Sequence, residues 1–153
     1  MHFEGFPLGK EFPLQGGEIG REEVISFAQQ YDPIPLHMDE SYGKTTRYGD
    51  IIAPGVMTFM RLWADFLRMG LLDDTLIAGK STHIEWNAPV FIGDYIDGVA
   101  VVTDRMERND YNGFLEITIR GYNQKRDLVL TNVTELVVAR KQREMGASPW
   151  ENA

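Results

Sequence analysis

The chain has 153 residues, of which 43% are hydrophobic and 25% are charged, and its formal net charge is -8 at pH 7. This composition is typical of one soluble globular domain, and the acidic balance without clustered Lys and Arg argues against a nucleic-acid partner. The chain has no cysteine, which excludes disulfides, thiolate nucleophiles and cysteine-ligated zinc. It is also compatible with a reducing cytoplasm, where we expect the protein.

A single domain is expected over residues 1–143, followed by a polar tail at 144–153. The N-terminal residues lack the cationic start and the continuous apolar core of a signal peptide. The longest apolar stretch, IIAPGVMTFMRLWADFLRMGLL, is interrupted by Arg61, Asp65 and Arg68. We therefore expect no membrane span and no membrane partner.

The first predicted elements are a short strand near GKEFPL and a helix over residues 21–30, whose apolar side chains recur at helical spacing. Pro33 ends this helix because the residue before a proline is disfavoured in the helical region. Pro35 fixes a second backbone dihedral. The stretch from Asp32 to His37 is therefore expected to run extended and stiff.

A long helix is predicted from Pro54 to Met69, with proline in its first turn and Gly70 at its end. Its apolar residues cover most of its circumference. One narrow polar stripe remains, formed by Thr58, Arg61, Asp65 and Arg68. A helix of this kind must be covered by the rest of the protein on nearly every side.

After this helix the apolar residues alternate with polar ones, as in strands. The segments GKSTHIEWNAPV, YIDGVAVVTDRMER, FLEITIRGYN and LVLTNVTELVVAR predict four long antiparallel strands. A long apolar helix together with such strands predicts an α+β protein in which a curved antiparallel sheet wraps the helix, the hot-dog fold. An open α+β sandwich would give the same pattern.

Asp32 and His37 are the first candidates for chemistry. A carboxylate and an imidazole on a stiff loop are able to share one water molecule and exchange protons with it near neutral pH. Alternatively, Asp32 caps a turn and His37 forms a local hydrogen bond. We expect no metal, because the other histidines are remote in sequence and the nearby Asp39 and Glu40 fit the start of a helix.

Gly55 is a second candidate because it lies where the long helix starts. Unpaired N–H groups point outward there, together with the positive end of the helix dipole. Such donors stabilise an oxygen that gains negative charge during a reaction. The alternative is that Gly55 only allows the helix to pack closely against a strand.

The run FAQQYDPIPLHMDESYGKTTRYGDIIAPGVM, residues 27–57, resembles the hydratase motif of the MaoC-like, (R)-specific enoyl-CoA hydratase family. The matching positions are Asp32, Pro35, His37, Asp39, Gly43, Thr46, Tyr48, Gly49, Pro54 and Gly55. The segments LGKEFPLQGGEIGREEVISFA and WNAPVFIGDYI are also similar to that family. The resemblance covers about residues 8 to 140.

This resemblance implies a hot-dog fold and a reaction. Asp32 and His37 would position and deprotonate a water that adds to C3 of a trans-2-enoyl-CoA, giving an (R)-3-hydroxyacyl-CoA, or catalyse the reverse dehydration. The Gly55 N–H would hold the thioester oxygen. The resemblance implies a homodimer or larger homo-oligomer and no cofactor, since the CoA thioester is the substrate. Ile34 departs from the family pattern, which often has Asn there, and this puts the orientation of the pair or the substrate preference in question.

The acyl tunnel would be walled by Met57, Met60 and Trp63, although these residues are equally well explained as core. Two other functions stay open. A hot-dog thioesterase would need a carboxylate on or beside the central helix, where Asp65 is the available one. A non-catalytic acyl-CoA binding module would keep the fold without the turnover.

Overall fold

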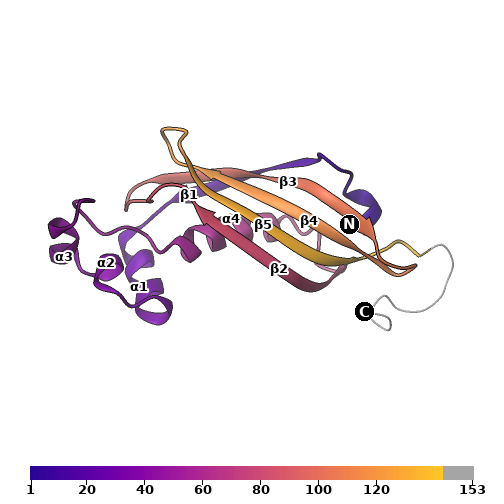
Figure 1. Ribbon diagram of the computed structural model, residues 1–153, viewed down its shortest axis with the longest axis horizontal. Coiled ribbons are helices and arrows are strands. Elements are labelled where there is room, and N and C mark those ends of the chain that lie inside the picture. Colours follow the sequence, from indigo (N-terminus) through magenta and orange to yellow (C-terminus); the bar gives the residue numbers. More distant parts are fainter. Residues whose placement is uncertain (143–153) are drawn as a thin grey trace.

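The computed structural model describes residues 1–142, so the predicted polar tail at 144–153 lies outside the described residues. Its main element is one antiparallel sheet of five strands in the order β1-β3-β4-β5-β2 (Figure 1). The strands are β1 (Glu11–Glu18), β2 (Leu76–Trp86), β3 (Tyr95–Glu107), β4 (Asn112–Tyr122) and β5 (Leu128–Ala139). The strands predicted from the alternating pattern are therefore all present.

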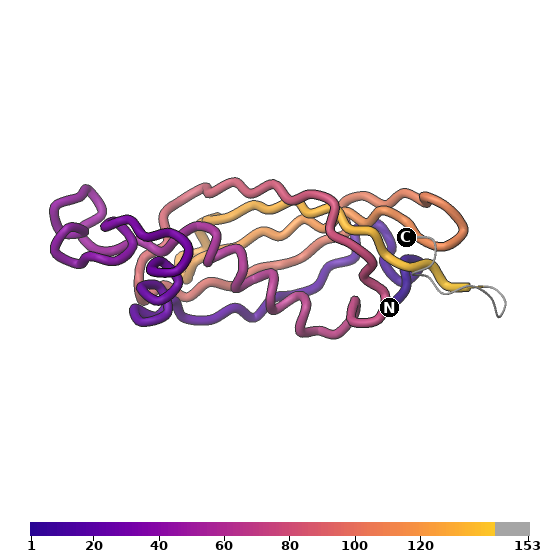
Figure 2. Tube along the Cα trace, turned by 90° about the horizontal axis from the view of Figure 1, so that it is seen from below, coloured from indigo at the N-terminus to yellow at the C-terminus, as the bar shows by residue number. Residues whose placement is uncertain are grey.

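The described helices are η1 (Phe3–Gly5), α1 (Arg21–Tyr31), α2 (Pro35–Met38), α3 (Glu40–Thr45) and α4 (Gly55–Arg68). The short helices α1, α2 and α3 gather at one end of the sheet, and α4 runs along its concave side (Figures 1 and 2). Within residues 1–142, none of the helices has the length and apolar character needed to cross a membrane.

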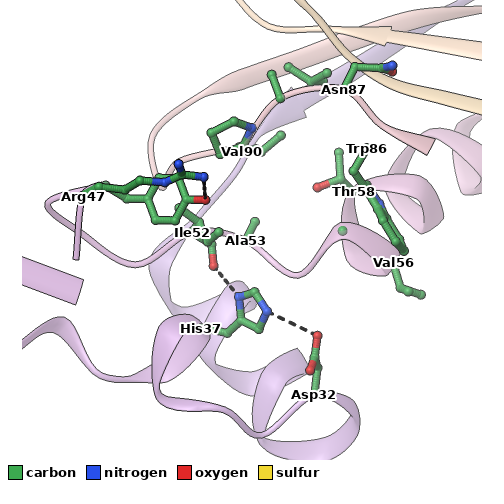
Figure 3. A pocket seen from close by; sticks show the side chains of 15 residues that line it. Asp32, His37, Arg47, Ile52, Ala53, Val56, Thr58, Trp86, Asn87 and Val90 are labelled. Carbon is green, nitrogen blue, oxygen red and sulfur yellow. Dashed lines mark hydrogen bonds and ion pairs between the residues drawn. The ribbon is translucent and has the colours of Figure 1, made fainter. Parts of the chain in front are cut away.

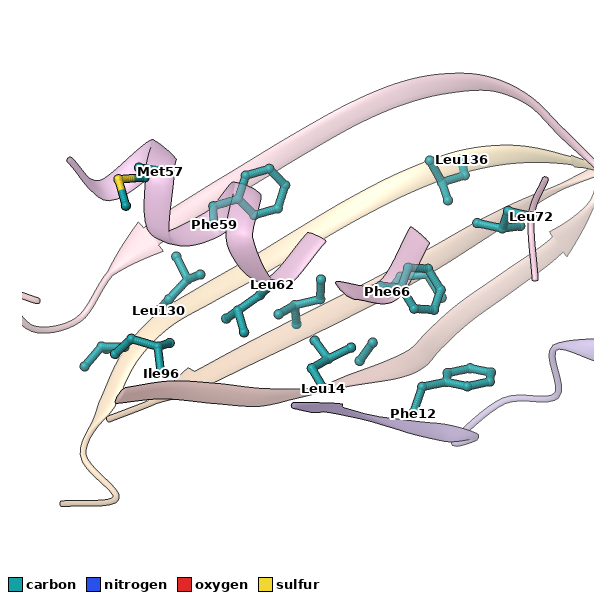
Figure 4. Packing of buried hydrophobic residues seen from close by; sticks show 14 of the residues in the cluster. Phe12, Leu14, Met57, Phe59, Leu62, Phe66, Leu72, Ile96, Leu130 and Leu136 are labelled. Carbon is teal, nitrogen blue, oxygen red and sulfur yellow. The ribbon is translucent and has the colours of Figure 1, made fainter. Parts of the chain in front are cut away.

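The core lies between α4 and the inner face of the sheet (Figure 4). From α4, Leu62 and Phe66 are buried against it, and β4 contributes Leu115, Ile117 and Ile119, which are fully buried. These three residues alternate along β4 because successive side chains of a strand point to opposite faces of the sheet. The curved sheet around one long helix confirms the predicted α+β hot-dog fold.

The prediction that the long helix is covered on nearly every side was wrong. Val56 and Met60, four residues apart on α4, are 44% and 46% exposed. The sheet covers only the side of α4 that faces it, since β1 and β2 are its two edges. One apolar face of α4 is therefore open in the single chain.

The prediction that Asp32 to His37 runs extended was also wrong in part. Ile34 is extended (φ -109°, ψ 150°), as expected before a proline, but Pro35 opens the helical turn α2, which contains His37. Proline suits the first position of a helix because its fixed φ is helical and no N–H is needed there. His37 is therefore held by a short helix.

Candidate active site

Asp32 and His37 face each other across the turn between α1 and α2 (Figure 3). Asp32 is the residue at which α1 ends, and Pro33 and Pro35 direct the chain into α2. The Oδ2 atom of Asp32 lies 3.3 Å from Nε2 of His37. His37 is almost completely buried, whereas the side chain of Asp32 is 41% exposed. The structure thus brings the two predicted residues together.

The orientation of the His37 ring is fixed by a second contact, because its Nδ1 lies 2.7 Å from the carbonyl oxygen of Ile52. A carbonyl oxygen only accepts, so Nδ1 carries a proton and donates it. In the neutral ring Nε2 is then an acceptor, as are the oxygens of the ionised Asp32 carboxylate. Nε2 and the carboxylate oxygen are therefore close enough for one proton donor, such as a water molecule, to contact both.

Asp32 and His37 lie at a cavity of about 490 Å³, called here the main cavity. It is lined by Asp32, His37, Arg47, Tyr48, Ile52, Ala53, Gly55, Val56, Thr58, Trp86, Asn87, Ala88, Pro89, Val90 and Val129. Its walls come from the end of α1, α2, the loop before α4, the first turn of α4, the end of β2 with the segment after it, and the start of β5 (Figure 3). The acid-base pair and the start of α4 thus share one space.

Gly55 is the first residue of α4, after Pro54. An added Cβ at Gly55 would lie 2.1 Å from Nε1 of Trp86, the last residue of β2, which is far too close. The close packing that the sequence offered as an alternative is therefore present, and a larger residue would require this indole to move. The N–H of the first helical residue has no acceptor within its own helix, so the role of Gly55 as a donor stays a prediction.

Arg47 is the only Lys or Arg among the described residues that line the main cavity. Its Nη2 donates to the hydroxyl of Tyr48 at 2.9 Å, and its guanidinium lies 5.0 Å from the centre of the Tyr48 ring. The hydrogen bond to Tyr48 raises the pKa of Arg47. The main cavity thus has one oriented positive charge on a chain whose net charge is -8.

The predicted tunnel residues do not line the main cavity. Met57 is buried in the core, and Trp63 packs against Phe59 and Phe66 with ring centroids 6.0 Å and 5.7 Å apart. Met60 and Trp63 instead border a second hollow of about 460 Å³ between α4 and β2. Their packing is evident, and their contact with an acyl chain stays a prediction.

Two further residues from the sequence have other surroundings. Asp65 does not line the main cavity, and its Oδ2 accepts a hydrogen bond of 2.8 Å from the N–H of Gly16. Ile34, the departure from the family pattern, is the residue before α2 and is also absent from the cavity wall. The contact between Asp32 and His37 forms with Ile34 in place.

Residues 1–142 contain no group of three or more His, Asp or Glu side chains that could hold a metal ion. Sequence reasoning missed Arg47, Trp86 and Asn87 as residues of the cavity, and it noted Thr58 only as part of a polar stripe. A polar residue on a nearly apolar helix was the one signal that could have identified Thr58. No comparable feature of the sequence identifies Trp86, because the end of β2 and the start of α4 come together only in the folded chain.

Comparisons with known proteins agree with this architecture. An uncharacterized protein, YdeM of Bacillus subtilis (strain 168), is 26% identical over 141 residues, which are 92% of this chain and all of that protein. The MaoC-like dehydratase from Rhodospirillum rubrum has a similar structure, with a TM-score of 0.82 at 21% identity over 92% of this chain and 98% of that chain.

The (R)-hydratase from A. caviae involved in PHA biosynthesis is also similar, with a TM-score of 0.72 at 26% identity over 90% of this chain and 99% of that chain. The family model described as MaoC like domain matches residues 7–119, which is more than half of the chain. The chain therefore belongs to the MaoC-like dehydratase domain family.

Proposed function

We propose that this protein is a hydratase that adds water to a trans-2-enoyl-CoA to give an (R)-3-hydroxyacyl-CoA, or catalyses the reverse dehydration. The observation that carries the proposal is the 3.3 Å contact between Asp32 and His37 at a cavity that also contains the start of α4. Family membership supports the reaction class, as does the similarity to an (R)-hydratase. The CoA thioester is the substrate, and no cofactor enters the reaction.

The first step is the activation of water by Asp32 and His37. His37 keeps its Nδ1 proton on the carbonyl of Ile52, so Nε2 and the Asp32 carboxylate are the groups that take a proton from water. The water oxygen bonds to C3 of the substrate as the C2–C3 π bond breaks. A proton from the pair then bonds to C2, so that one water is consumed for each double bond.

The second contribution comes from the start of α4. As the π electrons move toward the thioester, its carbonyl oxygen gains negative charge. The N–H of Gly55, with the positive end of the helix dipole, would donate to this oxygen. Removing one such donor costs about a hundredfold to a thousandfold in rate in other enzymes. The same contacts serve the reverse dehydration.

The natural partner would be an acyl-CoA, and Arg47 supports this. A chain with a net charge of -8 repels an anion as a whole. A positive guanidinium at the main cavity, oriented by Tyr48, gives the phosphates of CoA a favourable approach. Nucleic acid remains an unexpected partner, because the chain as a whole is acidic.

We also propose a homodimer or larger homo-oligomer. Val56 and Met60 leave an apolar face of α4 open, and β2 is an edge strand with backbone groups free to pair. A second copy of the chain would cover both. This proposal is independent of the reaction.

Purified protein incubated with crotonyl-CoA tests the proposed function. We expect the absorbance of the enoyl group to fall while no free thiol is released, and chiral analysis of the product to give the (R)-3-hydroxyacyl-CoA. Release of free thiol would instead indicate a thioesterase. A binding module would be indicated if short, branched and long enoyl-CoA substrates all bound tightly but neither lost enoyl absorbance nor released free thiol.

A further inference from the structure

Thr58 is a buried polar residue at the main cavity that has no assigned function. It lies on α4, one turn after Gly55, and is 1% exposed. Its hydroxyl oxygen is buried and has no hydrogen-bond partner among the described residues. Buried polar groups are nearly always paired, because an unpaired one loses its contacts with water and gains nothing in return. The hydroxyl of Thr58 therefore needs a partner that the folded chain does not supply.

Other threonines of the chain show how such a hydroxyl is normally satisfied. Those of Thr45, Thr46 and Thr75 each donate to a backbone carbonyl oxygen at 2.7 Å. In a helix the usual acceptor is the carbonyl four residues earlier. For Thr58 that carbonyl belongs to Pro54, and it accepts the N–H of Thr58 at 3.3 Å. The side chain of Thr58 makes no such bond.

The position of Thr58 places its hydroxyl near the predicted donor of Gly55. Side chains of a helix lean toward its N-terminus, so the side chain of Thr58 leans over the turn that begins at Gly55. Figure 3 shows its oxygen on the side of α4 that faces Ile52 and Ala53 across the main cavity. Threonine in a helix has two favoured χ1 rotamers, so more than one direction is available to its hydroxyl.

We propose that the hydroxyl of Thr58 is a second hydrogen-bond donor to the thioester oxygen of the substrate, beside the N–H of Gly55. This assignment rests on the proposed function. Two donors around one oxygen stabilise the charge that develops there, and the ligand satisfies a hydroxyl that is unpaired in the free protein. The hydroxyl of Thr58 would then have a hydrogen-bond partner only when the substrate is bound.

Thr58→Val tests this assignment because valine keeps the shape of threonine and has a methyl group in place of the hydroxyl. We expect kcat with crotonyl-CoA to fall by about a hundredfold with a smaller change in KM, and Tm to stay the same or rise. Thr58→Ser keeps the donor and should retain most of the rate. The matched control is Thr118→Val on β4, where the buried hydroxyl is paired with Thr103 at 2.8 Å. This control should lower Tm and leave kcat unchanged.

A second measurement does not require turnover. The Raman carbonyl stretch of bound butyryl-CoA, octanoyl-CoA or isovaleryl-CoA should shift to lower frequency in the wild type and shift less in Thr58→Val. An unchanged kcat or an equal carbonyl shift in the variant would overturn the role of Thr58 while the proposed function stands. A wild type that binds none of these thioesters would overturn both.

Discussion

Gly55 has a packing role and a predicted catalytic role. The indole of Trp86 occupies the place that a Cβ of residue 55 would take, and the predicted donor to the thioester oxygen is the N–H of Gly55. The packing alone favours glycine, because a larger residue would have to displace this indole. Substitution of Gly55 therefore changes both the fold and the candidate site, and a second substitution is needed to separate them.

Gly55→Ala should destabilise the wild type because its new methyl group overlaps Trp86. In a Trp86→Ala background the overlap is absent, and alanine is favoured over glycine in a helix by up to about 1 kcal/mol. The sign of the effect should therefore reverse, with a coupling of about 1–3 kcal/mol between the two sites. Chemical denaturation of the four proteins measures this coupling. An equal cost in both backgrounds would show that Trp86 is not what requires Gly55.

The sequence predicted the reactive residues better than it predicted the residues around them. Asp32 and His37 are five positions apart, and the prolines between them allow only a few paths, so their contact was predictable. The contact between Gly55 and Trp86 joins residues that are far apart in the chain. The unpaired hydroxyl of Thr58 was equally hidden, because pairing depends on neighbours that only the fold supplies.

Among the elements, α4 has an apolar face that the rest of the described chain leaves exposed. Met60 and Val56 are exposed on one face, and Met60 borders the hollow between α4 and β2. An exposed apolar face next to a free strand edge is typical of a surface that pairs with another chain. In a single chain this face remains in water.

Met60→Asp should therefore weaken the proposed homo-oligomer. Burying a carboxylate between two apolar helix faces is unfavourable, because the charge loses its hydration. Light scattering after size exclusion should give the mass of an oligomer for the wild type and of one chain for the variant. Met106→Asp on β3 is the control, since Met106 is also exposed but lies away from α4. A monomeric wild type would contradict the proposal.

The strand β4 and the short helix α2 differ in how well the sequence predicted them. The alternation of apolar and polar residues predicted the strand β4, because a strand has a period of two residues, and Leu115, Ile117 and Ile119 are its buried side chains. The sequence does not predict the short helix α2, because prolines at positions 33 and 35 favour an extended chain. Pro35 instead occupies the one helical position that favours proline.

Over the whole molecule, the sheet and α4 form the core, and the end that holds α1, α2 and α3 supplies the acid-base pair (Figure 1). The pair therefore comes from one part of the chain and the predicted oxyanion donor from another. The α+β elements were predictable because they follow from periodicity along the chain, whereas the choice of the hot-dog fold over an open sandwich came from the resemblance to the family. The main cavity was not, since its walls come from segments that meet only after folding.

The central claim is that Asp32 and His37 act together on one water, and the rates of three variants test it most directly. Asp32→Asn, His37→Ala and the double variant are compared with the wild type on crotonyl-CoA, with circular dichroism and Tm to check that each is folded. Each single variant should lose about a hundredfold or more in kcat. The double variant should lose little more than the worse single variant, because residues that act as one unit are not additive. A folded Asp32→Asn or His37→Ala with a normal rate would contradict the claim.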